Sequence, residues 1–437
     1  MAPKRDAANS IVVRTGVPAG WCEKAVADLA RIVGGGTPDR EQLAYWRNGT
    51  IPWITPTDLT ANGTKYIESG AEKITELGLK NSNATLVNPG AIVFSTRGTV
   101  GSMAVAAVPL TCNQSCEVLV PRVGAVVGDF LYYLLNFGIS AFIRLSAGTT
   151  FNSITRRDIV RVRFAVPRDV DEQGAIARLL DVVDKALERT QAAIERARTL
   201  RYSLIHGLLM HGIRKEEPKR SEAGLIPSSW KCDVLGGNLD EGPTNGVYRP
   251  ESDYAPQGTR IVRIDDFADG QIHNLSGLRR VIVQPAIQRR YALSNDDVLI
   301  NRVNSLSHIG KAALVPTLDE PTIFESNMMR LRCGPRLLPA FLLVVLCSDI
   351  ARRHWLSRAK PAVNQASINQ RDVRELLIPM PEPDEQQEIA CIVSKANEQI
   401  EALRSVSKAQ NALKRSLLNE VLSGRIRTMN AAEATAL

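Results

Sequence analysis

The chain has 437 residues, of which 44% are hydrophobic and 23% are charged, so it is too apolar to be disordered throughout and long enough for two or three globular domains. Its formal net charge of +8 favours a polyanionic partner, and its seven scattered cysteines indicate reduced thiols rather than a disulfide framework or a zinc site. No apolar run reaches membrane-spanning length and the charged first nine residues lack a signal-peptide core, so we expect a cytoplasmic protein.

A first module is expected at residues 17–168, after a flexible lead of residues 1–16. Turn signals alternate there with short apolar runs, as in a mixed α/β domain. Ile51–Thr55 is predicted to be a strand that runs into the polar turn Pro56-Thr57-Asp58. Ala91–Phe94 is predicted to be a second strand, which is followed by a polar loop closed by glycines.

The first module is expected to end in a helix and a strand. Asp129–Leu145 is predicted to be helical. Ile159–Val166 alternates apolar and basic residues, which is typical of a half-exposed strand.

A long helix is expected at residues 169–214, and the same pattern occurs again at residues 382–427. Both copies begin Asp-Glu-Gln and end Ile-Arg, at a constant offset of 213 residues. Apolar positions recur in alternating steps of four and three, which is the seam that pairs helices, and each helix would be about 60 Å long. The seam positions are Ile176, Leu180, Val183, Leu187 and Ile194 in the first copy and Ile389, Val393, Ile400, Leu403 and Leu417 in the second.

A charged linker at residues 215–225 leads into a second module at residues 226–381, and a tail of residues 428–437 ends the chain. The second module repeats the layout of the first: Ile261–Asp266 takes the place of the strand that ends near Asp58. The module edges and the helices match closely, whereas the middles hardly match. The predicted fold class is therefore α+β, an internally duplicated chain whose two similar α/β modules face two different targets.

No catalytic constellation is visible in the sequence. There is no Walker sequence, no Asn/Asp-Pro-Pro-Tyr/Phe loop of an amine methyltransferase and no nucleophile elbow, and the five histidines are dispersed. We therefore expect a non-enzymatic chain that holds no metal and no cofactor.

Polar side chains that follow the expected strands suit the edges of DNA bases. Arginine can bind guanine through two hydrogen bonds and asparagine can do so with adenine. A role in stabilising turns is the alternative for each of them. The candidates for base contact are Thr55, Thr57, Asp58, Thr96, Arg97 and Thr99 in the first module and Arg263, Asp265, Asn301, Arg302 and Asn304 in the second.

Runs of basic residues lie near the end of each module. Contacts with phosphate are the natural role of such runs, because they supply affinity without sequence information. A solvated basic face is the alternative. The candidates for phosphate contact are Arg144, Arg156 and Arg157 in the first module and Arg352, Arg353 and Lys360 in the second.

This duplicated order, a variable module followed by Asp-Glu-Gln and a long helix that ends in Ile-Arg, resembles the specificity subunit (HsdS) of type I restriction-modification systems. The resemblance covers residues 17 to 427. It implies two target recognition domains that each read one half of a split DNA site. It also implies that the helices pair antiparallel as a coiled-coil spacer, in an arrangement with pseudo-twofold symmetry.

The resemblance further implies partners. Two modification subunits would bring S-adenosylmethionine and methylate adenine, and restriction subunits that use ATP could join them. Because Arg201 and Lys414 interrupt the seam, their helix faces are candidate docking sites for these partners.

Two readings of other classes stay open. One is a stand-alone regulator that binds nucleic acid through two modules and needs no methyltransferase. The other is a coiled-coil scaffold without a nucleic-acid role, which would show no steep loss of DNA binding with added salt.

Overall fold

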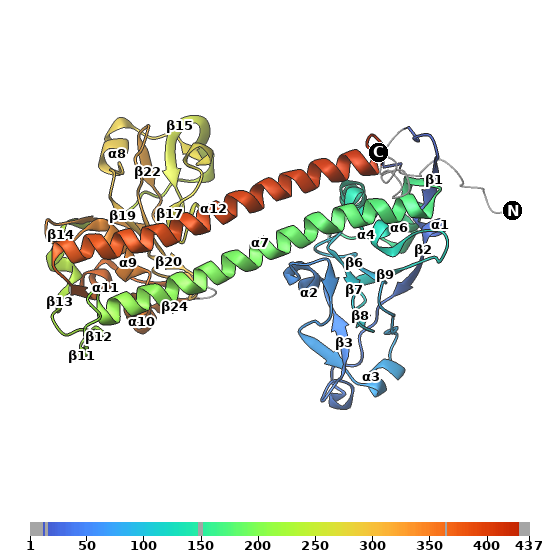
Figure 1. Cartoon of the computed structure of the whole chain (residues 1–437), viewed down its shortest axis with the longest axis horizontal. Helices are drawn as coiled ribbons and strands as arrows, with labels where there is room; N and C mark the ends of the chain where they lie inside the picture. The colour runs from blue at the N-terminus through green and yellow to red at the C-terminus, as the bar shows by residue number, and fades with distance from the viewer. Residues whose placement is uncertain (1–11, 14–15, 147–151, 363–364, 428–437) are drawn as a thin grey trace. The chain divides into compact units, whose positions relative to one another are not determined.

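The computed structural model describes residues 12–13, 16–146, 152–362 and 365–427 (Figure 1). The chain divides into two compact units, Met1–Ala192 with Ser405–Leu437 and Ala193–Arg404. Each unit therefore combines one α/β module with part of each long helix. Most of the expected lead and all of the expected tail lie outside the described residues.

The module of the first unit is built around a five-stranded sheet. Its strands are β1 (Trp21–Ala25), β2 (Ala30–Gly34), β3 (Ile51–Ile54), β4 (Tyr66–Ile67), β5 (Glu72–Ile74), β6 (Ile92–Ser95), β7 (Met103–Ala106), β8 (Thr111–Cys112), β9 (Cys116–Pro121) and β10 (Arg163–Pro167). Its helices are α1 (Val26–Leu29), η1 (Leu43–Tyr45), α2 (Pro56–Ala61), α3 (Glu76–Lys80), α4 (Gly128–Phe137), α5 (Ile139–Ser146) and α6 (Arg156–Arg161). The sheets have the orders β2-β9-β6-β7-β4, β5-β3-β8 and β1-β10.

The module of the second unit repeats this plan with longer additions. Its strands are β11 (Pro218–Ser221), β12 (Gly224–Pro227), β13 (Lys231–Val234), β14 (Leu239–Asn245), β15 (Tyr254–Val262), β16 (Phe267–Ala268), β17 (Gly270–Ile272), β18 (Arg280–Val281), β19 (Val298–Asn301), β20 (Val303–Asn304), β21 (Ala312–Leu314), β22 (Thr322–Phe324), β23 (Met328–Cys333), β24 (Lys360–Ala362), β25 (Gln365–Ser367) and β26 (Leu377–Met380). Its helices are η2 (Leu235–Asn238), η3 (Glu251–Asp253), η4 (Leu275–Gly277), α8 (Pro285–Arg290), α9 (Pro339–Leu346), α10 (Asp349–Arg358) and α11 (Gln370–Arg374). The sheets have the orders β14-β23-β19-β21-β17-β16, β18-β15-β22, β20-β25-β24, β13-β26 and β11-β12.

Corresponding strands pair in the same way in the two modules. The central strand β6 lies between β9 and β7, and β19 lies between β23 and β21, with antiparallel pairing throughout. The parallel pair β3–β8 corresponds to the parallel pair β15–β22. The chain is therefore a mixed helix and sheet protein with two repeated domains, as the duplicated sequence pattern predicts.

Two long helices follow the modules: α7 (Val170–His211, 42 residues) and α12 (Pro383–Leu422, 40 residues), green and red in Figure 1. Each is followed by a glycine with positive φ, Gly212 at 64° and Gly424 at 68°. That conformation ends a helix at little cost only for a residue without a Cβ. The helices therefore end three residues before 214 and five residues before 427, the limits expected from the sequence.

The core of each unit joins the beginning of one long helix to the end of the other. In the first unit, Ile176 of α7 and Val421 of α12 belong to the same buried cluster as the α4 residue Phe130. In the second unit, Ile389 of α12 and Ile205 of α7 share a cluster with the α9 residues. The helix segments are therefore antiparallel within each unit.

The seam positions lie on the covered side of the helices. Those at Leu187, Leu403 and Leu417 are half-buried, and the others are buried. Because full burial of one such apolar side chain stabilises a fold by about 1.5–3 kcal/mol, this stripe is a main source of helix stability.

Two predictions near the strand ends were wrong. Pro56-Thr57-Asp58 is the first turn of α2, because Thr55 and Asp58 form a capping box and Pro56 occupies the first helical position. The strand expected from Ile159 begins only at Arg163, because residues 156–161 form the capped helix α6.

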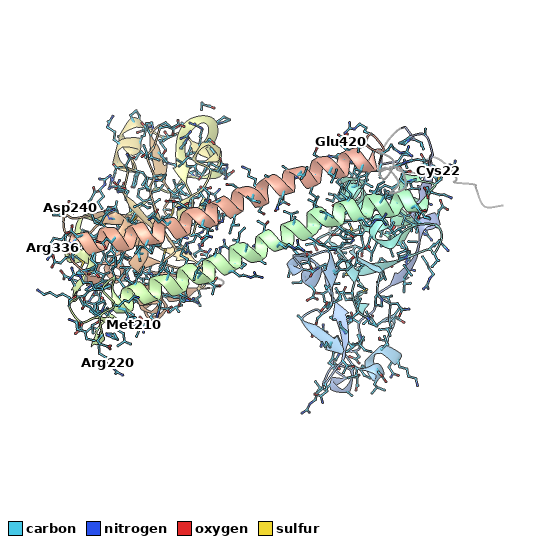
Figure 2. The ribbon with its side chains drawn as sticks, viewed as in Figure 1. Cys22, Met210, Arg220, Asp240, Arg336 and Glu420 are labelled. Atoms are coloured by element: carbon cyan, nitrogen blue, oxygen red, sulfur yellow. The ribbon has the colours of Figure 1, made fainter. Side chains whose placement is uncertain are left out.

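Three other expected segments also differ. The helix predicted over Asp129–Leu145 is divided into α4 and α5 at Gly138, where a Cβ would lie 2.5 Å from the ring of Phe164. The linker at 215–225 contains most of the β11–β12 hairpin, on which Figure 2 marks Arg220. In the lead, Val13 is held in place, since its amide donates to the carbonyl of Arg163 at 3.0 Å.

Candidate nucleic-acid interface

Three polar segments meet in the first module, each directly after a strand. We call them the first loop cluster: residues 55–58 after β3, 96–101 after β6 and 113–115 after β8. The amide of Thr96 donates to the carbonyl of Ser115, and the amide of Asn113 donates to the carbonyl of Ile54, both at 2.9 Å. The 113–115 turn thus holds the other two segments together.

The second module has a corresponding second loop cluster: residues 263–266 after β15, 301–305 at the end of β19 and 325–327 after β22. The amide of Arg302 donates to the carbonyl of Asn327 at 2.9 Å. The amide of Ile264 donates to the carboxylate of Glu325 at 2.7 Å. The turn after β8 in the first module, and after β22 in the second, therefore connects the two segments that were selected from the sequence.

Three candidates of the first loop cluster stabilise the loops themselves. The carboxylate of Asp58 accepts from the amide of Thr55 at 2.8 Å and from the amide of Ala71 at 2.8 Å. Thr96 is buried, and its hydroxyl donates to the carbonyl of Ser115 at 3.0 Å. These polar groups are engaged locally, which is the turn-stabilising alternative considered for every candidate.

The remaining candidates of this cluster are exposed. Thr57, Arg97 and Thr99 all have well-exposed side chains. The hydroxyl of Thr60 on α2 donates to the hydroxyl of Thr99 at 3.3 Å, so α2 and the loop after β6 lie side by side. Arg97, Thr57 and Thr99 thus belong to one accessible face.

The arginines of the second loop cluster are held by the turn after β22. Nε of Arg263 lies 3.6 Å from the carboxylate of Glu325, and Arg302 donates to the carbonyl of Ser326 at 3.2 Å. Burial raises the pKa of Glu325 above its usual range, although Arg263 favours its charged form. Asp265 is exposed.

The two asparagine candidates differ in accessibility. Asn301 is fully buried, and its amide group has no hydrogen-bond partner among the described residues. Asn304 is half-buried, and its side chain accepts from the amide of Ser305 at 2.8 Å. Asn301 can reach a base only if it leaves the core.

Sequence reasoning missed the two connecting turns. Asn113-Gln114-Ser115 separates the apolar strands β8 and β9, and Glu325-Ser326-Asn327 separates β22 and β23. Gln114 is exposed and carries both a donor and an acceptor. The available signal was a polar triplet with Asn and Ser between two short apolar runs.

The phosphate candidates lie on helices and a strand outside the loop clusters. In the first module Arg144 and Arg157 are exposed, whereas Arg156 forms an ion pair with Glu117 at 2.8 Å. In the second module Arg352, Arg353 and Lys360 are exposed, on α10 and at the start of β24. Arg156 is therefore the least available cation of the set.

The two residues that interrupt the seam face into the chain. Lys414 forms an ion pair with Asp184 at 2.6 Å within the first unit. Arg201 donates to the side chain of Asn397 at 2.9 Å within the second unit. Both side chains are therefore engaged within the chain, and docking of partner subunits on these helix faces stays a prediction.

The described parts of the chain show no group of three or more His, Cys, Asp or Glu side chains that could hold a metal ion. A hydrogen bond with Cys112 and burial raise the pKa of the Cys116 thiol, which disfavours the reactive thiolate of Cys116. No described helix combines the length and the apolar character needed to cross a membrane.

The family model for the "type I restriction modification DNA specificity domain" matches residues 18–196 and 281–410, which is more than half of the chain. The two matched segments each contain one module or part of it and the beginning of a long helix.

Among curated relatives, the specificity subunit of the type I restriction enzyme MjaIX from Methanocaldococcus jannaschii is 30% identical over 51% of this chain and 52% of that protein. The StySPI specificity subunit from Salmonella potsdam is 24% identical over 95% of this chain and 91% of that protein. The chain spans about half the length of the relatives that match it first, 52%, 40% and 49%.

Among solved structures, the S subunit of a type I restriction-modification system from M. genitalium has a TM-score of 0.52 and 16% identity, over 95% of this chain and 98% of that one. At this identity the likeness concerns the fold.

Proposed function

Because this chain belongs to the family of type I restriction-modification DNA specificity domains, we propose that it gives a type I restriction-modification complex its DNA sequence specificity. The observation that carries the proposal is the pair of loop clusters, which occupy the same three strand ends in both modules and have different residues. A strand frame that is repeated within the chain, with different polar loops, is what two readers of two half-sites require.

In this proposal each module is a target recognition domain for one half of a bipartite DNA site. The segments α7 and α12 form an antiparallel spacer, so helix length sets the gap between the half-sites, as dimer geometry sets half-site spacing in other proteins. The exposed arginines and Lys360 neutralise phosphates, and the loop clusters read base edges.

The chemistry belongs to partner subunits in this proposal. The chain itself is non-catalytic and binds no cofactor. Two modification subunits bring S-adenosylmethionine and methylate an adenine that is flipped out of the duplex. Restriction subunits that consume ATP can complete the complex.

Methylation mapping tests the proposal. The chain is expressed with its modification subunit in a host that lacks adenine methylation, and the DNA is sequenced for modified adenines. We expect a split motif, two short specified blocks around a fixed gap. A stable complex that leaves the DNA unmodified would contradict the proposal.

Binding at several salt concentrations separates the two other readings. A regulator would bind its site tightly without any modification subunit. A scaffold would lack the steep loss of DNA affinity with added salt that several phosphate contacts produce.

A further inference from the structure

One charged residue of each module is seated against the long helices. Lys65 is the last residue before β4, and Asp269 is the last residue before β17. These two strands correspond, because each pairs in parallel with the strand next to the central strand of its sheet, β7 or β21. By strand register Tyr66 corresponds to Gln271, so Lys65 and Asp269 have opposite charges and lie one position apart at the start of corresponding strands.

Lys65 is almost completely enclosed, with 3% of its side chain exposed. Its Nζ lies 2.6 Å from the carboxylate of Asp181 on α7 and 2.7 Å from that of Asp129 on α4. The hydroxyl of Tyr133 contacts Asp181 and Asp184, both at 2.7 Å. Burial opposes the charged amine, but Asp129 and Asp181 raise the pKa of Lys65 above its usual value.

Asp269 lies in the tight turn between β16 and β17, with a φ of 53° and 15% of its side chain exposed. Arg198 and Arg201 of α7 each approach its carboxylate to 3.0 Å, and Arg404 of α12 also forms an ion pair with it. Burial alone would favour the neutral acid, but Arg201, Arg198 and Arg404 hold the pKa of Asp269 below its usual range.

The helix residues around Lys65 and those around Asp269 also differ in charge from their counterparts on the other long helix. At the offset of 213 residues, Asp181 corresponds to Ser394 and Asp184 to Asn397, so the second unit lacks the acids that face the first module. Conversely, Arg198 corresponds to Asn411, and Arg404 corresponds to Gln191. Arg201 corresponds to Lys414, so this one position is basic in both units, and Lys414 pairs with Asp184 at 2.6 Å. The helix surface is thus acidic where it receives lysine and basic where it receives aspartate.

We propose that Lys65 and Asp269 are positioning residues whose opposite charges orient each module on its own helix surface and make the two module positions non-interchangeable. This inference rests on the proposed function, since the orientation of a module determines where its loop cluster meets DNA. A buried charge without its partner destabilises a fold strongly, and a like charge does so more.

Charge reversal in the full chain tests the proposed role of Lys65 in positioning the first module. Hydrogen–deuterium exchange is measured over residues 65–67 in Lys65→Met, which keeps the approximate volume, and in Lys65→Glu, which reverses the charge. We expect Lys65→Glu to exchange at least about tenfold faster than Lys65→Met, because Asp129 and Asp181 repel it. The double variant Lys65→Glu/Asp181→Lys should recover most of the protection, and Lys73→Glu at an exposed site is the control.

A module transplant tests the claim that the two module positions are non-interchangeable. Residues 22–167 are replaced by residues 231–380, so that a second copy of the second module faces Asp181 and Asp184. Exchange in the transplanted β17 segment should be at least about tenfold slower with Asp269→Lys in that copy than with the original aspartate.

Equal exchange in Lys65→Met and Lys65→Glu would overturn the positioning role, and a double variant no better than Lys65→Glu would do the same. Equal exchange in the two transplants would overturn the non-interchangeability. None of these measurements uses DNA. If the exchange results are as expected but the chain directs no DNA methylation, the proposed function fails and the inferred charge pairing still stands.

Discussion

The indole of Trp21 donates to the carboxylate of Glu172 at 3.2 Å, and the indole of Trp230 donates to that of Glu385 at 3.0 Å. Each tryptophan opens a module, and each glutamate belongs to the Asp-Glu-Gln that opens a long helix. Two short repeats that look independent in the sequence are therefore one contact, made twice. This contact joins the beginning of each module to the beginning of the long helix that follows the module.

Removing the negative charge from this contact should loosen one unit. Glu172 also forms an ion pair with Arg427 at 2.7 Å, so Glu172→Gln leaves a cation without its partner. We expect a loss of about 1–3 kcal/mol in the free energy of unfolding, measured by urea denaturation of the full chain. The exposed Glu188→Gln on the same helix is the control and should change little. Equal stability of the two variants would contradict this role.

The glutamine of the same motif holds the module helix. Gln386 is fully buried; its side-chain oxygen accepts from the amide of Leu338 at 2.9 Å, and its nitrogen donates to the carbonyl of Pro381 at 3.0 Å. Gln386→Ala leaves these groups unpaired and should cost about 2–4 kcal/mol of stability, whereas the exposed neighbour Gln387→Ala should cost under about 0.5 kcal/mol. Thermal unfolding of both variants measures the difference.

The exposed side of the first loop cluster should affect specificity rather than stability. Gln114→Ala removes a side chain with both a donor and an acceptor, and we expect relaxed reading at one position, worth about 1–3 kcal/mol of discrimination. Methylation mapping with quantification of near-cognate sites measures this. A uniform fall in methylation at all sites would instead indicate a general loss of affinity.

Arg157 should behave in the opposite way. Arg157 is an exposed cation outside the loop cluster. Arg157→Ala should therefore lower the affinity for all DNA sequences alike and reduce the slope of log affinity against log salt concentration by about 1. Equilibrium binding at several salt concentrations checks this, with Arg156→Ala as the comparison. Arg156 is already paired with Glu117 and should have a smaller effect. An unchanged slope in Arg157→Ala would remove it from the phosphate set.

Acid should weaken the second unit through Asp269. The pKa of this carboxyl is lower in the folded chain than in the unfolded one, so its stabilising effect is present above the unfolded pKa and is lost as the pH falls through the folded pKa. The difference in Tm between wild type and Asp269→Asn should therefore shrink as the pH is lowered from about 6 to about 3. A constant difference over this range would contradict the pairing with the arginines.

The long helices and the duplication could be predicted because their signals are local and periodic. The seam repeats every few residues, and Gly212 and Gly424 end the helices in the conformation that glycine favours. The capped turns could not be predicted as firmly, since Pro56-Thr57-Asp58 suits both a turn and the first turn of a helix. The capping bond between Thr55 and Asp58 decides between them.

The candidate interface could be predicted only in part. Strand ends located two segments of each loop cluster correctly in the fold, but the 113–115 and 325–327 turns became visible only through hydrogen bonds between distant residues. Burial was equally hidden: nothing in the residues around Asn301 marks it as internal, whereas Arg97 is exposed. The pairing of Arg201 and Lys414 within the chain depends on the antiparallel helix contact, which short sequence windows do not contain.

The most direct test of the proposed function is methylation mapping after the exchange of one module. Residues 17–168 are replaced by the corresponding module of another specificity subunit, and the chain is expressed with its modification subunit in a host without adenine methylation. We expect that one block of the split motif changes, while the other block and the gap stay the same. A change in both blocks, or a motif that remains identical, would contradict the assignment of one half-site to each module.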